Sequence, residues 1–246
     1  MTGPFLSIVI PAHNEETRLP ATLEKIRSFL AAQPYTAEVV VVENGSSDRT
    51  LEIAQAFAAD WPTLRVIHSD ERGKGRAVRL GMLNATGEYR FFADADLSMP
   101  IEEVNRFIPP QIPELDVVNA SREAPGARRI GEPSFRHFVG RVFNTFVRVL
   151  AVPGLQDTQC GFKCFRGAVA EDVFKRQTIM GWTFDVEILY IARRRGYKII
   201  EVPIAWYYEA NSKIRVWSDS IHMLADLLTI RRNGRRGLYD DHAPRA

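Results

Sequence analysis

The chain has 246 residues, of which 46% are hydrophobic and 25% are charged, and its formal net charge is +2. This balance is typical of a globular protein, and the length suits one large α/β domain or two small ones. A net charge this small gives no overall reason to expect a nucleic-acid-binding protein. Arginines nevertheless cluster locally, in residues 122–148 and 231–236.

The two cysteines, Cys160 and Cys164, lie four residues apart with no second pair nearby. This spacing argues against a zinc site and against a disulfide framework, so it favours a reducing compartment. The apolar run 5–10 is too short for a signal peptide, and no segment reaches the length of a membrane-spanning helix. We therefore expect a cytoplasmic protein that is soluble or bound peripherally to a membrane.

Strand-like and helix-like segments alternate through the first half of the chain. Apolar runs rich in β-branched or aromatic residues predict strands at 6–11, 38–43, 64–69 and 89–96. Helical spacing predicts a helix over 17–32, and the turns 44–48 and 73–75 each precede a further helix. This order predicts a Rossmann-like α/β fold with a mostly parallel sheet flanked by helices. Ligands bind such sheets beyond the carboxyl ends of the strands.

The second half is less regular. We predict a strand at 116–122, a Gly/Pro/Arg-rich loop at 123–133 and an extended stretch at 198–209. Helices are predicted over 134–151, 167–176, 183–195 and 217–232. The simplest interpretation is a single domain over 1–233, followed by a polar tail, 234–246, that we expect to be flexible.

Two carboxylates, Asp94 and Asp96, follow the fourth predicted strand. At a strand end, both side chains can reach one hard cation. Mg²⁺ or Mn²⁺ accepts a few carboxylates and completes its octahedron with water and phosphate oxygens. Two acids separated by one residue are a weak signal alone, since a surface turn can also carry them. Their place in a βα series favours a metal site.

Three other polar segments follow predicted strands. PAHNEE (11–16) and ENGSSD (43–48) carry acids and amides that suit a nucleobase and ribose, and both also suit helix caps. RGKGR (72–76) is a short basic turn at a helix start, which suits a phosphate.

In combination, SIVIPAHNEE, VVVENGSSDRT, GKGRAVRLG and FADADLSMP resemble the family 2 glycosyltransferases of GT-A fold. Later segments narrow the resemblance. DTQCGFKCF (157–165), GWTFDVEILYIARRRGY (181–197) and NSKIRVWSDSIHMLADLLTIR (211–231) look like dolichyl-phosphate β-glucosyltransferases. Dolichyl-phosphate mannose synthases are the next most similar group. The resemblance covers nearly the whole chain, from about Ser7 to Arg232.

The resemblance implies a role for each matching residue. Nucleotide-sugar binding is implied for Pro11, Ala12, His13, Glu15, Glu43, Asn44, Ser46, Lys74, Asp94, Ala95 and Asp96. Contact with diphosphate or acceptor phosphate is implied for Arg122, Arg136, Ser212 and Lys213. The metal, Mg²⁺ or Mn²⁺, is implied at Asp94 and Asp96.

Two short segments depart from related families. Glu43 and Asn44 stand where the family usually has two aspartates, so the choice between uridine and guanosine stays open. Tyr207, Tyr208 and Glu209 stand where mannose synthases carry an arginine, which favours the glucosyl branch.

The catalytic residues implied are Asp94, Asp96, Asp157 and Asp185. Asp157 is a candidate base or acceptor-orienting acid, and a cap for the turn into Gly161 is the alternative. Asp185 and Glu187 point to different faces of a predicted helix, so one of them can face the acceptor. A helix-packing role for Asp185 is about equally favoured.

The resemblance implies an inverting transfer of a hexose, with glucose from UDP-glucose favoured, onto a polyprenyl phosphate of dolichyl type. Transfer of mannose from GDP-mannose and transfer to a soluble glycan are the alternatives. A nucleotide-sugar-binding protein without turnover is a more remote one, supported only by Glu43 and Asn44.

Helices 134–151 and 217–232 are candidates for lying in a membrane interface, because apolar faces in both are accompanied by arginines. An ordinary amphipathic core helix is the alternative for each. The resemblance favours the membrane for 134–151. We therefore expect peripheral attachment at the cytoplasmic face of a membrane.

Overall fold

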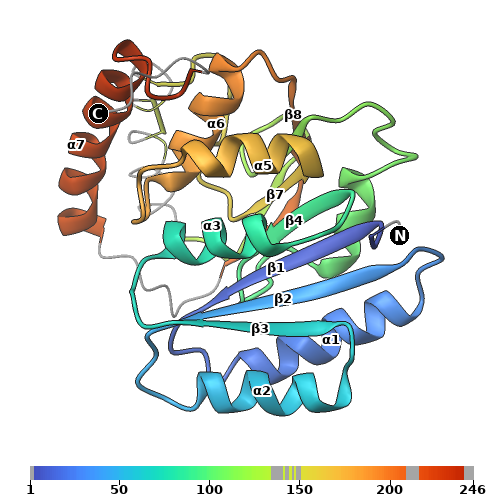
Figure 1. Cartoon of the computed structure of the whole chain (residues 1–246). Coiled ribbons are helices and arrows are strands. Elements are labelled where there is room, and N and C mark those ends of the chain that lie inside the picture. The colour runs from blue at the N-terminus through green and yellow to red at the C-terminus, as the bar shows by residue number, and fades with distance from the viewer. Residues whose placement is uncertain are drawn as a thin grey trace.

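A computed structural model describes residues 3–133, 141, 144–145, 147, 151–208 and 216–240, with the backbone alone for 216–222. One central sheet runs through the molecule, and helices cover both of its faces (Figure 1). Most of the predicted helix 134–151, together with Arg136, Glu209, Ser212 and Lys213, lies outside the described residues.

Seven strands form the central sheet in the order β3-β2-β1-β4-β7-β5-β8. Every neighbouring pair is parallel except the two that β7 makes, with β4 and with β5. The sheet therefore confirms the mostly parallel architecture predicted from the alternating segments. The strands are β1 (Leu6–Ala12), β2 (Ala37–Asn44), β3 (Leu64–Ser69), β4 (Tyr89–Ala93), β5 (Val117–Ser121), β7 (Phe162–Arg166) and β8 (Ile199–Pro203).

Two apolar cores lie on opposite faces of the sheet, because successive side chains of a strand alternate between faces. Ile8 and Ile10 of β1 belong to one core, and Val9 between them belongs to the other. The first core packs under α1 (Leu19–Ala31), α2 (Thr50–Asp60) and the 3-10 helix η1 (Ile101–Phe107). The second packs under α3 (Lys74–Asn84), α5 (Gly167–Arg176), α6 (Phe184–Arg194) and α7 (Val216–Arg235).

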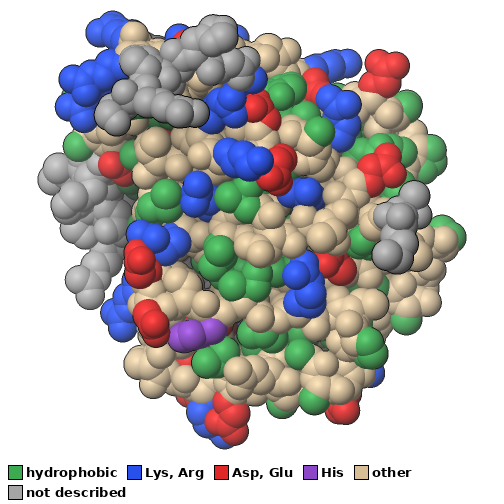
Figure 2. Space-filling model, in the orientation of Figure 1, with side chains coloured by type: hydrophobic (Ala, Val, Ile, Leu, Met, Phe, Trp, Pro, Cys, Tyr) green, Lys and Arg blue, Asp and Glu red, His purple; other side chains and the backbone are tan. Residues whose placement is uncertain are grey.

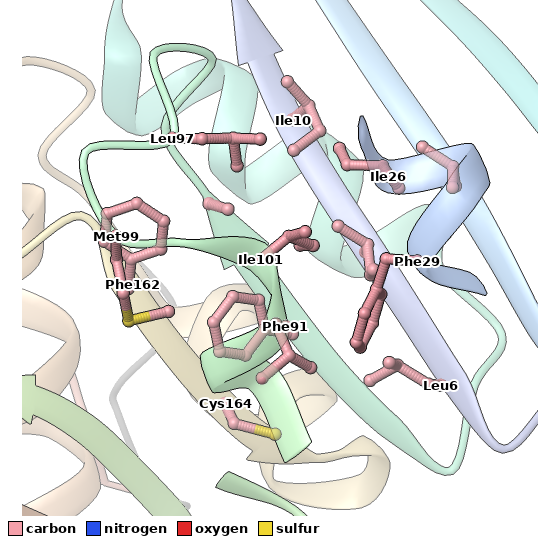
Figure 3. Close-up of a cluster of buried hydrophobic side chains, with 14 of the residues drawn as sticks. Leu6, Ile10, Ile26, Phe29, Phe91, Leu97, Met99, Ile101, Phe162 and Cys164 are labelled. Atoms are coloured by element: carbon pink, nitrogen blue, oxygen red, sulfur yellow. The ribbon is translucent and has the colours of Figure 1, made fainter. Parts of the chain in front are cut away.

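The first core reaches the loop that carries the two acids. Leu97 and Met99, just beyond the acidic motif, pack in the same cluster as Ile10 and Phe162 (Figure 3). The loop 94–99, called the acidic loop below, is therefore anchored by the burial of the apolar residues that follow Asp96.

Strand β7 has no counterpart in the elements expected from the sequence. It pairs antiparallel with β4, and Phe162 lies opposite Ala93. Because an antiparallel strand enters where its neighbour leaves, the turn before β7 reaches the edge of the sheet from which Asp94 and Asp96 project. The segment 157–161 thus meets the acidic motif through tertiary pairing.

A second, two-stranded sheet joins β6 (Arg128–Ile130) to β9 (Ala205–Tyr207) in parallel. The sequence predicts a loop for the first segment and one extended stretch for the second. The structure divides that stretch at Ile204, whose backbone binds Ser121 on one side and Arg128 on the other. This division carries Trp206 and Tyr208 away from the central sheet.

The chain after α7 is packed as far as residue 240. Gly237 adopts a positive φ of 73°, which turns the chain back, and Tyr239 is fully buried. Residues 234–240, which the sequence predicts to belong to a flexible tail, are therefore part of the packed structure, and the rest of that predicted tail lies outside the described residues. Within the described part of the chain, no helix is both long enough and apolar enough to cross a membrane.

Candidate active site

A cavity of about 370 Å³ lies beyond the carboxyl ends of β1, β2 and β4. This is the edge at which parallel α/β sheets bind ligands, and the volume lies within the range of small-molecule sites. The cavity is lined by Pro11, His13, Glu15, Arg18, Asn44, Arg72, Gly73, Lys74, Asp94, Ala95, Asp96, Ser98, Arg122, Gln159, Gly161, Phe162, Gly181, Trp182, Trp206 and Tyr208.

Hydrogen bonds hold the acidic loop in place. Asp96 accepts a hydrogen bond from the backbone N–H of Ser98 at 3.0 Å, and Thr22 of α1 donates to the carbonyl of Ala95 at 2.6 Å. Leu97 adopts a positive φ of 45°, which is uncommon for a residue with a side chain. This backbone conformation, held by the surrounding contacts, leaves both carboxylates on the cavity wall.

Lys74, at the start of α3, places its ammonium 2.7 Å from the carboxylate of Asp94. Burial opposes the charge of Lys74, but Asp94, Asp185 and Asp96 outweigh it, so the pKa of Lys74 lies above its ordinary value. Burial also raises the pKa of Asp94, against the opposing pull of Lys74. Lys74 is therefore a fixed positive charge in the cavity.

Gly161 gives Asp94 the room that it occupies. A Cβ added at Gly161 would lie 2.0 Å from Oδ2 of Asp94, far inside van der Waals contact. Any side chain at position 161 would therefore displace this carboxylate. Gly181, on another part of the cavity wall, has nothing within 4 Å of the same added atom.

The loops after β1 and β2 are joined to each other. Nδ1 of His13 lies 2.8 Å from the carbonyl oxygen of Asn44, and Asn14 accepts a hydrogen bond from the backbone N–H of Ser47 at 2.8 Å. Glu15 accepts two hydrogen bonds of 2.7 Å from Arg18. These contacts present His13, Glu15 and Asn44 together on the cavity wall.

Glu43 does not line the cavity. Its carboxylate accepts from the backbone N–H of Ser46 at 2.6 Å and lies 2.5 Å from Nδ1 of His68. Burial works against its charge, yet Ser46 and His68 together lower the pKa of Glu43 below its ordinary value. Of the two residues that stand where the family usually has aspartates, Glu43 and Asn44, only Asn44 lines the cavity.

Arg122, which lines the cavity, forms an ion pair with the buried Asp157. The guanidinium donates to both carboxylate oxygens, at 2.7 and 3.0 Å, and the backbone N–H of Arg122 donates to Oδ2 at 3.0 Å. Burial alone would raise the pKa of Asp157, but Arg122 outweighs it and lowers the pKa to about 2. Such a carboxylate is a weak base, and it positions the arginine that lines the cavity.

Asp185 lies below the cavity, paired with Lys163 of β7. The ammonium of Lys163, which is fully buried, lies 2.5 Å from Oδ1 of Asp185 and 2.6 Å from the carbonyl of Cys160. This contact joins α6 to the turn that carries Gly161. The geometry favours the packing role for Asp185 over one at the acceptor.

The predicted site residues thus divide into three groups. Those on the cavity wall are Pro11, His13, Glu15, Asn44, Lys74, Asp94, Ala95, Asp96 and Arg122. Those that do not line it are Ala12, Glu43, Ser46, Asp157 and Asp185. Arg136, Ser212 and Lys213 fall outside the described residues.

The cavity also contains residues that sequence reasoning missed, among them Gln159, Trp206 and Tyr208. One signal was available for the two aromatic residues, since positions two apart in an extended segment share a face. The guanidinium of Arg122 lies 5.4 Å from the ring centre of Trp206, within the range of a cation–π contact.

Comparison with known proteins gives consistent matches. The model of the family described as glycosyl transferase family 2 matches residues 7–174. The dolichyl-phosphate β-glucosyltransferase of Saccharomyces cerevisiae is 34% identical, over 97% of this chain and 77% of that protein. The human dolichyl-phosphate β-glucosyltransferase is also 34% identical, over 92% of this chain and 74% of that protein.

A solved structure shares the fold. Glucosyl-3-phosphoglycerate synthase from Mycobacterium tuberculosis, in complex with Mn²⁺, UDP and phosphoglyceric acid, superposes with a TM-score of 0.65 at 20% identity. The match covers 93% of this chain and 78% of that chain.

The substitution Asp157→Asn should lower the free energy of unfolding by about 3 kcal/mol at neutral pH, because it leaves Arg122 buried without its counter-charge. The pKa of Asp157 is depressed in the folded state, so the contribution of its charge is complete above the unfolded value of about 4. It disappears as the pH falls towards about 2. Denaturant unfolding of both proteins between pH 7 and pH 2.5 measures this. A stability difference that is constant across the range would contradict it.

Proposed function

The chain belongs to glycosyl transferase family 2, in which it groups with the dolichyl-phosphate β-glucosyltransferases, and we propose that it transfers glucose from UDP-glucose to a polyprenyl phosphate. The family resemblance and the GT-A fold predicted from the sequence are confirmed. The observation that carries the proposal is the convergence of Asp94, Asp96, Lys74 and Arg122 on one cavity at the carboxyl edge of the sheet.

The donor end of the cavity is the part built by the loops after β1 and β2. His13, Glu15 and Asn44 offer polar groups to a base and ribose, and Arg72 lies beside them on the wall. Lys74, at a helix N-terminus, faces the place where the diphosphate meets Asp94. The positive charge there favours the departing diphosphate over the intact nucleotide sugar, since charge develops as the bond breaks.

Two of the acidic side chains in the cavity, Asp94 and Asp96, suit a divalent cation. No group of three or more His, Cys, Asp or Glu side chains gathers at one point in the described part of the chain. A cation here would therefore have Asp96 and Asp94 as protein ligands and complete its shell with water and diphosphate oxygens, as Mg²⁺ and Mn²⁺ prefer. When bound, such a cation neutralises negative charge on the leaving diphosphate.

The proposed reaction is a single displacement. An oxygen of the acceptor phosphate forms a bond to the anomeric carbon while the bond from that carbon to the diphosphate breaks, and its electron pair leaves with the diphosphate. One displacement inverts the anomeric centre. Because the acceptor phosphate is already anionic at neutral pH, no protein base is required, which agrees with the pairing of Asp157 to Arg122.

The substrates are tested by a donor and acceptor screen. UDP-glucose and GDP-mannose are each incubated with a short polyprenyl phosphate and Mg²⁺ or Mn²⁺, and the labelled sugar is partitioned between organic and aqueous phases. Glucose in the organic phase is expected. Labelled mannose there, labelled glycan in the aqueous phase, or nucleotide binding without product would each replace the proposal by one of its alternatives.

A membrane surface is the proposed location of the acceptor. On α7 and the turn that follows, Leu224, Leu228 and Leu238 are exposed large apolar side chains. Arg231, Arg232, Arg235 and Arg236 border a hollow on the same helix with Leu228. In the described residues no carboxylate pairs with these arginines, and Figure 2 shows basic side chains gathered over the carboxyl-terminal end of α7. Apolar contact with attraction to anionic lipid supports peripheral attachment at the cytoplasmic face.

The substitution Asp96→Asn should reduce glucose transfer at least 100-fold, because the carboxylate most available to a cation loses its charge. Its circular dichroism and melting temperature should remain close to those of the unchanged protein. Near-normal transfer at saturating Mn²⁺ would contradict the role given to Asp96.

The pair Gly161→Ala and Gly181→Ala tests the position of Asp94. Both glycines line the cavity, but only a methyl group at 161 collides with the Asp94 carboxylate. Transfer should fall on the order of 100-fold in the first variant, since displacement of a catalytic group by about 1 Å has this effect. It should change less than about threefold in the second. Equal rates in the two variants would be inconsistent with the proposal.

Reversing the charge of Arg232 and Arg235 to Glu should weaken binding to vesicles of anionic lipid by about tenfold or more, because each arginine contributes about 1 kcal/mol near such a surface. Vesicle co-sedimentation with and without phosphatidylserine measures this. The matched control reverses two exposed lysines elsewhere, Lys25 and Lys198, with the same change in net charge. Equal loss in both double variants would show that only net charge matters.

A further inference from the structure

The loop 177–183 joins α5 to α6 and supplies Gly181 and Trp182 to the cavity wall. It packs directly on the turn that carries Lys74. The carbonyl of Met180 accepts from the backbone N–H of Arg76 at 3.2 Å, and the side chain of Gln177 donates to the carbonyl of Gly75 at 2.9 Å. The position of this loop therefore sets the position of the α3 N-terminus.

Close packing leaves the two segments little freedom. A Cβ at Gly75 would lie 2.6 Å from Cβ of Phe184, 2.8 Å from the carbonyl oxygen of Ile179 and 2.9 Å from that of Gly181. The ammonium of Lys74 lies 5.4 Å from the ring centre of Trp182. A shift of loop 177–183 would therefore move Lys74 relative to Asp94.

Glu187 of α6, a fully buried carboxylate, holds the loop by hydrogen bonds. One oxygen accepts from the backbone N–H groups of Thr178, at 2.9 Å, and Ile179, at 2.7 Å. The other accepts from the hydroxyls of Thr178, at 2.5 Å, and Tyr239, at 2.7 Å. Four donors match the hydrogen-bonding capacity of an ionised carboxylate, which offsets the cost of burying its charge.

Residues of α7 and of the turn that follows it supply one of these donors and form hydrogen bonds with both ends of the loop. Tyr239 is fully buried against Tyr190, and Asn233 of α7 donates to the hydroxyl of Thr178 at 3.2 Å. At the far end of the loop, Thr183 donates to Asp226 of α7 at 2.7 Å. Contacts from α7 and the turn after it thus span the loop.

We propose that Glu187 and Tyr239 are positioning residues for the donor site, and that they act by holding loop 177–183, and with it Trp182 and Lys74, in place. The proposal rests on the proposed function only for the identity of the donor. Neither side chain lines the cavity, so an effect on donor binding must be indirect, and the loop is the cavity segment that Glu187 contacts.

The variant Tyr239→Phe removes one hydroxyl and keeps the buried ring. Amide hydrogen exchange, followed by mass spectrometry of fragments covering 73–80 and 177–183, should become about fivefold faster in both. The control Asp240→Asn breaks an exposed ion pair with Arg194 on the same turn without touching Glu187. It should leave both fragments unchanged. Unchanged exchange in Tyr239→Phe, or equal acceleration in the control, would overturn the proposal.

Steady-state kinetics separates positioning from loss of folded protein. With a saturating short polyprenyl phosphate, Tyr239→Phe should raise KM for UDP-glucose about fivefold and keep kcat within about twofold. A purely structural role would lower kcat with the folded fraction and leave KM unchanged, and this result would refute the proposal. Glu187→Gln should raise KM further than Tyr239→Phe, because an amide has one acceptor oxygen where the carboxylate has two.

The exchange measurement also keeps the two proposals separate. If the unchanged protein does not use UDP-glucose, the proposed function fails, while faster exchange of both fragments in Tyr239→Phe would still support the role of Tyr239 and Glu187.

Discussion

The position of Asp94 is the constraint on which the rest of the cavity depends. Its carboxylate binds Lys74 at 2.7 Å and fills the space that a side chain at residue 161 would take. The acidic loop is also tied to α1 through Thr22. Four segments far apart in sequence therefore meet at the loop that carries Asp94, and a shift in any of them would change the charge presented to the cavity.

Buried charge pairs surround this acid. Arg122 with Asp157, and Lys163 with Asp185, each place a carboxylate beside a cation where water is largely excluded. Taking such charges out of water is costly, and good pairing geometry is needed to offset the cost. The consequence is a preorganised arrangement in which each acid holds a cation in place, and Asp157, whose pKa Arg122 lowers, is poorly suited to accept a proton. An acceptor that is already anionic suits such a site.

The nucleotide end of the cavity differs from its diphosphate end. The carboxylate of Glu43 is bonded to Ser46 and His68 and does not line the cavity. Its neighbour Asn44 does. A neutral amide there can both donate and accept hydrogen bonds. Under the proposed function, recognition of the base would therefore fall to Asn44, with His13 and Glu15 on the neighbouring loop.

The βα order, the mostly parallel sheet and the acids at its edge could be predicted from the sequence, because apolar periodicity and turn residues act over short stretches. The family resemblance also singled out Lys74 and Arg122, which both line the cavity. The tertiary structure was needed to show that Glu43, Asp157 and Asp185 do not line the cavity, and that β7 delivers Gly161 to Asp94. It likewise showed that Tyr239 is linked to loop 177–183 by a hydrogen bond to Glu187, which binds the loop. These outcomes depend on pairing between segments distant along the chain, about which local patterns carry no information.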